Sequence, residues 1–225
     1  MRRKQEKMLY WIKDTHRNAF MNMAIDEVLF NHYDDASVIR TYYWDKPFTS
    51  IGYFQKSKEV AAGSFVRRFT GGLTVNHHHD TSYCFVTSSK YWNVYDYNKT
   101  YMIIHLALKR ALENCGIYTS MLGRKTSTVS NICIDTFCIN DLLLNGKKIA
   151  GSCLRRRGSK LIVEGSMHIL LKNRYKDLFT DLFAKNLAAA VGGGLKEIKL
   201  DEIVIKKALT VASEKYSNPY WNNKY

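Results

Sequence analysis

The stretch LLLNGKKIAGSCLRRRGSKLIVEG, residues 142–165, carries most of the information about the fold. Its Asn145-Gly146 pair is typical of a two-residue hairpin turn, because both residues tolerate positive φ. Gly158-Ser159 predicts a second tight turn further along. The two turns divide this part of the chain into three expected strands: Asp141–Asn145, Lys147–Leu154 and Leu161–Val163.

Helices and further strands flank this stretch. Apolar residues recur at helical spacing from Met21 to Leu29, and Asn18 precedes them as a candidate N-cap. A second apolar stripe predicts a helix over Asn98–Asn114 that ends at Gly116. Strands are expected at Val38–Trp44, Thr49–Tyr53, Val66–Thr70 and Ser82–Thr87, and further helices at Asp177–Ala190 and Asp201–Tyr216. This mixture predicts an α/β or α+β domain.

The composition is that of an ordinary globular domain. The 225 residues, 46% hydrophobic and 24% charged, are enough to form a full core. With 2 prolines and 13 glycines the chain has no Pro- or Gly-rich linker, so we expect one domain over residues 1–225. The 5 cysteines form no C-x-x-C pair, which favours reduced thiols in the cytoplasm. We expect no signal peptide after the basic Met1–Lys7, and no run of ~18 apolar residues predicts a membrane span.

The charge is strongly basic. Lys and Arg number 34 against 20 Asp and Glu, which gives a net charge of +14. Such a field attracts nucleic acids, anionic membranes or acidic proteins, and a solvated lysine-rich surface without a partner explains it equally well. No zinc-finger, RRM or KH signature is present, so we expect no nucleic-acid partner.

Two motifs are candidates for ligand binding. In Arg67–Gly72 (RRFTGG), a strand runs into two glycines beside two guanidinium groups, which suits an anionic or carbonyl-bearing ligand. The same pattern is common in simple turns. The run His77–Asp80 (HHHD) suggests a metal site, but successive strand residues face opposite sides and no cysteine ligand follows at a fixed spacing. We therefore expect a polar pocket wall or a surface loop there, and no metal.

The segment from Leu142 to Val163 is basic and contains no acidic residue. We expect its arginines, Arg155–Arg157, to be solvated. A lysine at the start of a strand after a hairpin, such as Lys147 or Lys148, can instead point inward. There it would polarise a carbonyl group or lower the pKa of a thiol.

Four motifs together resemble the family of lipoate-protein ligases and octanoyltransferases. They are Asn22–Glu27 (NMAIDE), Tyr43-Trp44 followed by Ser50–Gln55 (SIGYFQ), Arg67–Gly72 with Val75 and His77, and Asn145–Ser152 (NGKKIAGS). The motifs occur in order and at the family's spacing. The resemblance implies a mixed β-sheet flanked by helices, as in the catalytic domain of biotin and lipoate protein ligases, with acyl carbonyl chemistry beside Lys148.

Two mechanisms occur within this family. Ligases form an acyl-adenylate from lipoate and ATP, with Mg²⁺, and usually carry a C-terminal accessory domain. Transferases pass octanoyl through a cysteine thioester without ATP. In the branch that this chain resembles, the cysteine lies 15 residues before the lysine, and Cys133 holds that position relative to Lys148. We expect no accessory domain, so the pattern favours a cytoplasmic octanoyltransferase, with the ligase as the alternative.

The resemblance also implies the site residues and partners. Cys133 and Lys148 would be catalytic, with no metal or cofactor in the transferase. The donor would be octanoyl-acyl carrier protein, and the acceptor a lysine of a lipoyl domain or of glycine cleavage H protein. The residues expected to contact the acyl substrate are Arg67, Arg68, Thr70, Gly71, Gly72, His77, Gly151 and Ser152.

The other cysteines and the departures from the family pattern complete the prediction. We expect Cys138 to pack in the sheet, and Cys84, Cys115 and Cys153 to be small buried hydrophobic residues. Leu73 replaces a Gly or Arg, Glu164-Gly165 stands in place of His-Gly, and Asn140-Asp141 is more familiar from the ligases. These departures leave the acyl specificity and the choice between transferase and ligase open.

Overall fold

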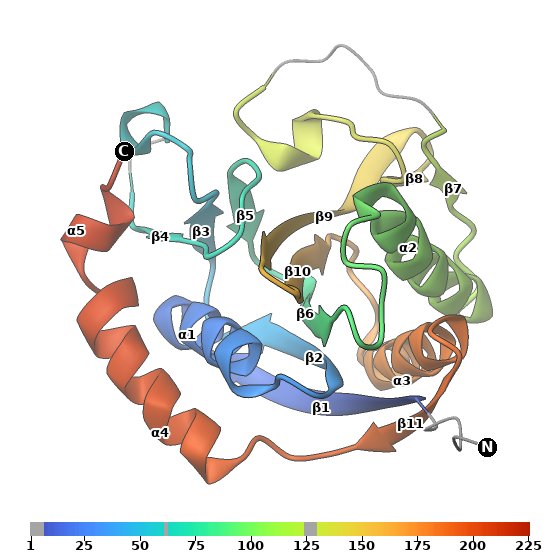
Figure 1. Ribbon diagram of the computed structural model, residues 1–225. Coiled ribbons are helices and arrows are strands. Elements are labelled where there is room, and N and C mark those ends of the chain that lie inside the picture. The colour runs from blue at the N-terminus through green and yellow to red at the C-terminus, as the bar shows by residue number, and fades with distance from the viewer. Residues whose placement is uncertain (1–6, 61–62, 124–129) are drawn as a thin grey trace.

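The computed structural model describes residues 7–60, 63–123 and 130–225, so all but the last residue of Met1–Lys7 lies outside the described residues. Within them the chain forms an eight-stranded mixed sheet and a three-stranded sheet (Figure 1). The large sheet runs in the order β11 (Gly193–Glu197), β1 (Lys7–Arg17), β2 (Ser37–Trp44), β6 (Thr81–Ser88), β10 (Lys160–Met167), β9 (Lys147–Arg157), β8 (Leu142–Leu144) and β7 (Ser120–Met121). The small sheet has the order β4 (Phe65–Arg67), β3 (Phe48–Ile51) and β5 (Val75–His77).

Helices cover both faces of the large sheet. On one face, α2 (Tyr97–Asn114) and α3 (Asn173–Ala190) pack on a core that includes Phe85 and Val163. On the other face, α1 (Ala19–His32) and α4 (Glu202–Val211) pack on a second core with Val86 and Ile162 (Figure 1). The two cores take alternate residues of the same strands, because successive side chains point to opposite faces. This architecture confirms the predicted mixed sheet flanked by helices.

The hairpins follow the predicted turns. Asn145 and Gly146 have φ values of 50° and 76°, which joins β8 to β9 through two left-handed residues. Gly158, with φ 59°, begins the turn that pairs β9 with β10 in antiparallel register. Both predicted hairpins are confirmed, although β9 and β10 extend further than the sequence indicates.

A β-bulge interrupts the pairing of β8 with β9. Leu142 pairs with Ala150 and Leu143 pairs with Lys148, so Ile149 is an extra residue on β9. A bulge shifts the alternation of side chains by one position. As a result, the side chain of Lys148 lies over Gly151, three residues further along the strand.

The NMAIDE motif of α1 serves the fold. Arg40 of β2 is completely buried, and its guanidinium lies 2.6 Å from Asp26 and 2.8 Å from Asp14 of β1. Asn22 accepts a further hydrogen bond from Arg40 at 2.7 Å. Because each buried charge has an opposite charge beside it, the network holds α1 against β1 and β2.

Several elements were not predicted. The strands β1, β5, β7 and β11 are absent from the sequence interpretation, as is the short helix α5 (Pro219–Asn222). The helix expected over 201–216 begins at Glu202 and changes to a π-helical turn at Ala212–Tyr216. The remaining short elements are 3-10 turns at Ser57–Glu59 (η1) and Cys133–Asp135 (η2). Among the described residues, no helix has the length and apolarity needed to span a membrane.

Candidate active site

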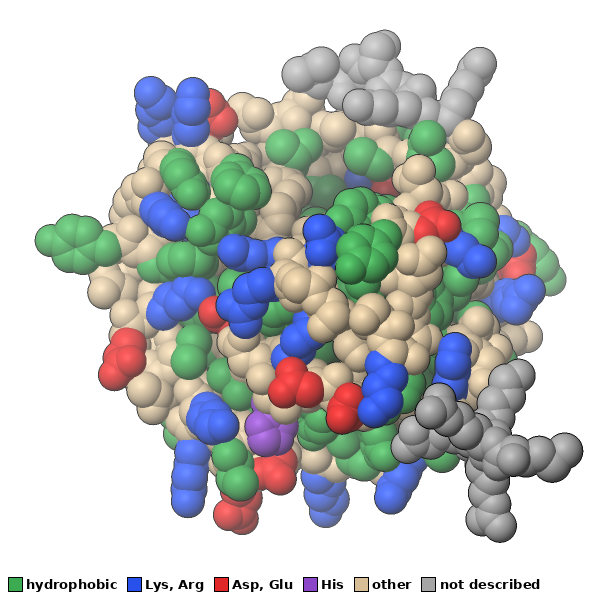
Figure 2. Space-filling view, viewed as in Figure 1, with side chains coloured by type: hydrophobic (Ala, Val, Ile, Leu, Met, Phe, Trp, Pro, Cys, Tyr) green, Lys and Arg blue, Asp and Glu red, His purple; other side chains and the backbone are tan. Residues whose placement is uncertain are grey.

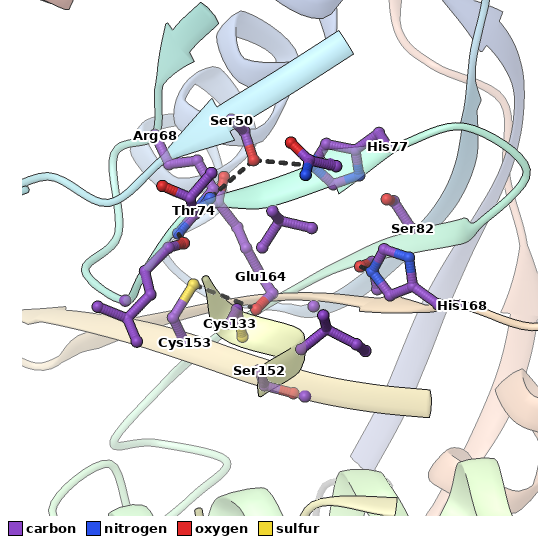
Figure 3. Close-up of a pocket in the computed structure, with 18 of the residues that line it drawn as sticks. Ser50, Arg68, Thr74, His77, Ser82, Cys133, Ser152, Cys153, Glu164 and His168 are labelled. Carbon is purple, nitrogen blue, oxygen red and sulfur yellow. Dashed lines mark hydrogen bonds between the residues drawn. The ribbon is translucent and has the colours of Figure 1, made fainter. Parts of the chain in front are cut away.

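A pocket with a volume of about 210 Å³ opens between the small sheet and strands β9 and β10 (Figure 3). One wall comes from β3, β5 and the loop after β4, and includes Ser50, Arg68 and His77. The opposite wall comes from η2 and the large sheet, and includes Cys133, Lys148 and Glu164. Apolar side chains that line the space include Met23, Trp44, Leu73, Val75, Ile132 and Ile134.

Cys133 and Lys148 meet in this pocket. The ammonium Nζ of Lys148 lies 3.5 Å from the Sγ of Cys133 and donates to the Cys133 carbonyl oxygen at 3.0 Å. The Cys133 backbone N–H donates to the Thr74 carbonyl at 2.8 Å, which ties η2 to the segment after the RRFTGG motif. The neighbouring Lys147 is exposed, so the hairpin register allows only one of the two lysines to enter.

The charge of Lys148 is stabilised by its surroundings. Asp141 Oδ2 lies 2.8 Å from Nζ, and the Thr136 carbonyl accepts a further hydrogen bond at 2.8 Å. Burial opposes the charge, but the Cys133 sulfur and the Asp141 carboxylate outweigh it and raise the pKa of Lys148. The ammonium group is therefore present at neutral pH, where it stabilises a thiolate or an oxyanion beside it.

The two arginines of the RRFTGG motif have different positions. Arg68 lines the pocket, where it donates to Ser50 Oγ at 2.7 Å and to the Leu73 carbonyl at 2.7 Å. Arg67 does not line it, which differs from the prediction. The Arg67 guanidinium donates to backbone carbonyls of the loop after β3 and of α5: Gly52, Tyr53, Gln55, Trp221 and Asn222. The N–H groups of Arg67 therefore join the loop after β3 to α5.

The remaining predicted contact residues are also divided. Gly72, with φ 89°, and Gly151 line the pocket, whereas Thr70 and Gly71 do not. The Thr70 hydroxyl is hydrogen-bonded to Glu164 instead.

Ser152 borders the pocket, but its hydroxyl is hydrogen-bonded elsewhere. It lies 2.6 Å from the Tyr83 hydroxyl and 2.7 Å from His105 Nε2, and neither of these residues lines the pocket. Figure 3 shows this side chain pointing away from the other sticks.

His77 belongs to a buried polar network in the pocket wall. Its Nδ1 lies 2.7 Å from Asp80 and its Nε2 lies 2.7 Å from Ser50, while the ring stacks on Trp44. Burial lowers the pKa of His77. For Asp80, burial opposes ionisation, but the contact with His77 lowers its pKa to about 2. The network orients a neutral imidazole in the pocket wall.

The other histidines of the HHHD run have no such role. His78 and His79 are exposed, and their rings lie against each other. Within residues 7–60, 63–123 and 130–225, no group of three His, Cys, Asp or Glu side chains is placed to hold a metal ion.

Two predictions about side-chain packing were wrong. Cys138 does not pack in the sheet. It is exposed in the loop before β8, where its backbone N–H donates to Asp141 at 2.6 Å. Arg155 is not solvated like Arg156 and Arg157, because it stacks on Phe69 and donates to the Phe69 carbonyl at 3.0 Å.

Sequence reasoning did not assign a site role to Glu164 or Cys153. Both line the pocket from paired positions on β10 and β9. The sequence signals for Glu164 are its place in the Glu164-Gly165 departure from the family pattern and its position directly after the apolar run Leu161–Val163. No site role was predicted for Ser50 or Asp141 either, and the contacts of Ser50 with Arg68 and His77 form only in the folded protein.

The comparison with known proteins identifies the family. A family model described as the lipoyl protein ligase A/B catalytic domain matches residues 18–190. The chain belongs to this family. The matched region includes the four motifs and both Cys133 and Lys148.

Curated relatives within the family are named octanoyltransferase LipM. The protein of Carboxydothermus hydrogenoformans is 36% identical over 74% of this chain and 66% of its own length. That of Brevibacillus brevis is 32% identical over 65% and 60%, and that of Staphylococcus aureus is 29% identical over 89% and 77%. The chain thus spans less than two thirds of the first two relatives.

Solved structures of lipoate-protein ligases share the fold. A putative lipoate protein ligase from T. acidophilum with bound lipoic acid has a TM-score of 0.77 at 20% identity, and covers 98% of this chain and 100% of its own. Lipoate-protein ligase A bound with ATP has a TM-score of 0.78 at 19% identity, with 97% and 98% covered. At these identities the likeness establishes the fold alone.

Proposed function

We propose that this protein is an octanoyltransferase that acts through a thioester on Cys133. The observation that carries the proposal is the position of the Lys148 ammonium, 3.5 Å from the Cys133 sulfur, in a largely apolar pocket. Membership of the family and the names of the LipM relatives support this assignment. The donor is octanoyl-acyl carrier protein, and the acceptor is a lysine of a lipoyl domain or of glycine cleavage H protein.

The first half-reaction transfers octanoyl to the enzyme. The Cys133 thiolate attacks the thioester carbonyl, a new carbon–sulfur bond forms, and the carrier thiol leaves with a proton from solvent. Lys148 stabilises the thiolate before attack and the oxyanion during it, because a fixed cation beside developing charge lowers the barrier. Asp141 holds the ammonium group in place at 2.8 Å.

The second half-reaction forms the amide. The neutral amine of the acceptor lysine attacks the acyl-enzyme, the Cys133 thiolate leaves, and the amine proton passes to solvent. An amide is more stable than a thioester, so the transfer proceeds without ATP or Mg²⁺. Arg68, His77, Gly72 and Gly151 line the space that the octanoyl chain occupies.

Intact mass spectrometry tests the proposal. Incubation with octanoyl-acyl carrier protein, without ATP, should add about 126 Da as a hydroxylamine-labile thioester. Cys133→Ala should abolish the adduct. The matched control Cys138→Ala, which removes an exposed residue's thiol from the lining of the same pocket, should retain it. If no form is acylated, and lipoate is attached only when ATP is supplied, the protein is a ligase.

A further inference from the structure

Glu164 places a buried carboxyl group beside the acyl pocket. The residue is 3% exposed and lines the pocket from β10 (Figure 3). Its Oε2 accepts hydrogen bonds from the Thr70 N–H at 3.3 Å and from the Thr70 hydroxyl. Its Oε1 is buried and has no hydrogen-bond partner among the described residues. Half of the carboxyl group is therefore unsatisfied.

No cation in the described part of the chain forms an ion pair with this carboxyl. The guanidinium that acts on it electrostatically, that of Arg68, donates to Ser50, Gly71 and Leu73, and its own buried Nε is unpartnered. The titratable and charged groups that interact with Glu164 from the surrounding elements are Asp26, Arg68, Cys84, Cys153, Tyr42 and Tyr216. Burial and the Asp26 carboxylate raise the pKa of Glu164 to about 7, against the opposing effects of Thr70 and Arg68.

The carboxyl has almost no exposed surface of its own, but it borders the pocket, so the medium that fills the pocket acts on its charge at short range. An alkyl chain that fills the pocket replaces solvent there and brings hydrocarbon beside the group. A carboxylate without a paired cation loses far more solvation than a neutral acid in such a change. We propose that Glu164 controls acyl binding: an unsubstituted acyl chain fills the pocket only when the Glu164 carboxyl is protonated, so binding takes up one proton. The proposal rests on the assignment of the pocket as the acyl site.

The sign of the pH dependence follows from this coupling. Hydrocarbon disfavours the charged form, so the pKa of Glu164 is higher in the complex than in the unoccupied protein. Affinity is at its maximum below the pKa of the unoccupied protein and falls as the pH rises towards the pKa of the complex. Between the two values, linkage of one proton makes the dissociation constant rise about tenfold per pH unit.

Titration calorimetry with octanamide tests the proposal. This probe has the acyl chain and a carbonyl group but carries no charge and cannot acylate Cys133. For the wild-type protein, the dissociation constant should rise by about tenfold for each unit above pH ~7, and Glu164→Gln should remove this slope. Glu197→Gln, which neutralises an exposed carboxylate on β11, should keep the wild-type slope.

A second measurement needs no variant. In buffers of different ionisation enthalpy, the wild-type protein should take up close to one proton per octanamide near pH ~8.5. An equal pH dependence in wild type and Glu164→Gln, or binding without proton uptake, overturns the role of Glu164. Absence of octanamide binding at any pH overturns the acyl site itself. The thioester adduct is measured separately, so a failure of the transfer mechanism leaves this test intact.

Discussion

At the residue scale, the position of Lys148 depends on a glycine. A Cβ atom added at Gly151 would lie 2.8 Å from Lys148 Cε and 3.0 Å from its Nζ. These distances are below ordinary contact, so the lysine would have to move. Because the lysine side chain is flexible, the backbone can keep its conformation while the ammonium group leaves Cys133 and Asp141.

Gly151→Ala should therefore reduce acyl transfer with little effect on folding. Displacement of a catalytic group by about 1 Å can cost on the order of 10² in rate. The rate of octanoyl-enzyme formation is the measurement, with thermal unfolding as the check on structure. Gly123→Ala is the matched control, because a Cβ atom there has no neighbour within 4 Å among the residues that the structure describes. Equal rates in the two variants would show that Gly151 does not position Lys148.

The meeting of Cys133 and Lys148 could be predicted from sequence, because the family motif has a fixed spacing between these two positions. Other residues that line the pocket around Cys133 and Lys148 could not be predicted in this way. Glu164 faces Cys153 and Thr70 only through the β9–β10 register and the approach of the loop after β4. Likewise, Arg67 and Arg68 are adjacent in sequence, and only the contact with the C-terminal segment separates their roles.

At the element scale, the short helix α5 secures the pocket wall. Asn222 accepts a hydrogen bond from the Arg67 backbone N–H at 2.9 Å and donates to the Tyr216 carbonyl at 2.8 Å. The Trp221 indole N–H donates to the Arg67 carbonyl at 2.9 Å. In this way α5 provides hydrogen-bond partners for the backbone N–H and carbonyl of Arg67 at the free edge of β4. This strand leads into Arg68 and Gly72.

Asn222→Ala should destabilise the protein. The substitution leaves a buried N–H and a buried carbonyl unpaired, which costs about 1–3 kcal/mol for each group. Urea unfolding measures the change. Asn223→Ala, which removes an exposed amide from the next position, is the control and should have a much smaller effect. A free energy of unfolding equal for the two variants would contradict the role of α5.

Elements with local signals were predicted, and those defined by distant partners were not. The hairpins could be read from Asn145-Gly146 and Gly158-Ser159, because turn chemistry lies within a few residues. The strand β1 pairs in parallel with both β2 and β11, whose residues lie far away in sequence. Its Asp14 accepts hydrogen bonds from Arg17 and from Arg40 of β2, so these charged residues interrupt the apolar pattern by which a buried strand is recognised in the sequence.

At the scale of the whole molecule, the chain carries a net charge of +14. Figure 2 shows Lys and Arg side chains across one face, several of them near the tip of the β9–β10 hairpin. Arg156 and Arg157 are exposed at this tip. Such a field speeds the approach of an acidic partner without defining a single contact.

Transfer from octanoyl-acyl carrier protein should therefore slow as salt is added. The Debye length falls from ~10 Å at 0.1 M to ~3 Å at 1 M, which screens the attraction between separated charges. Stopped-flow rates of enzyme acylation against ionic strength measure the effect. A small uncharged octanoyl thioester is the control, and its rate should change little. Equal salt dependence for the two donors would mean that the surface charge does not guide the carrier.

The bulge at Ile149 also constrains how this sequence can evolve. Substitutions between β8 and β10 can accumulate one at a time, since each affects a single position. Loss of one residue from β9 instead shifts the register of the strand by one position up to the hairpin turn. Gly151, Cys153 and Arg155 would then lie on the face of the sheet that Ser152 and Leu154 now occupy, and the reverse. We therefore expect descendants of this chain to keep the number of residues from Lys148 to Gly158 constant, even where the residues themselves diverge.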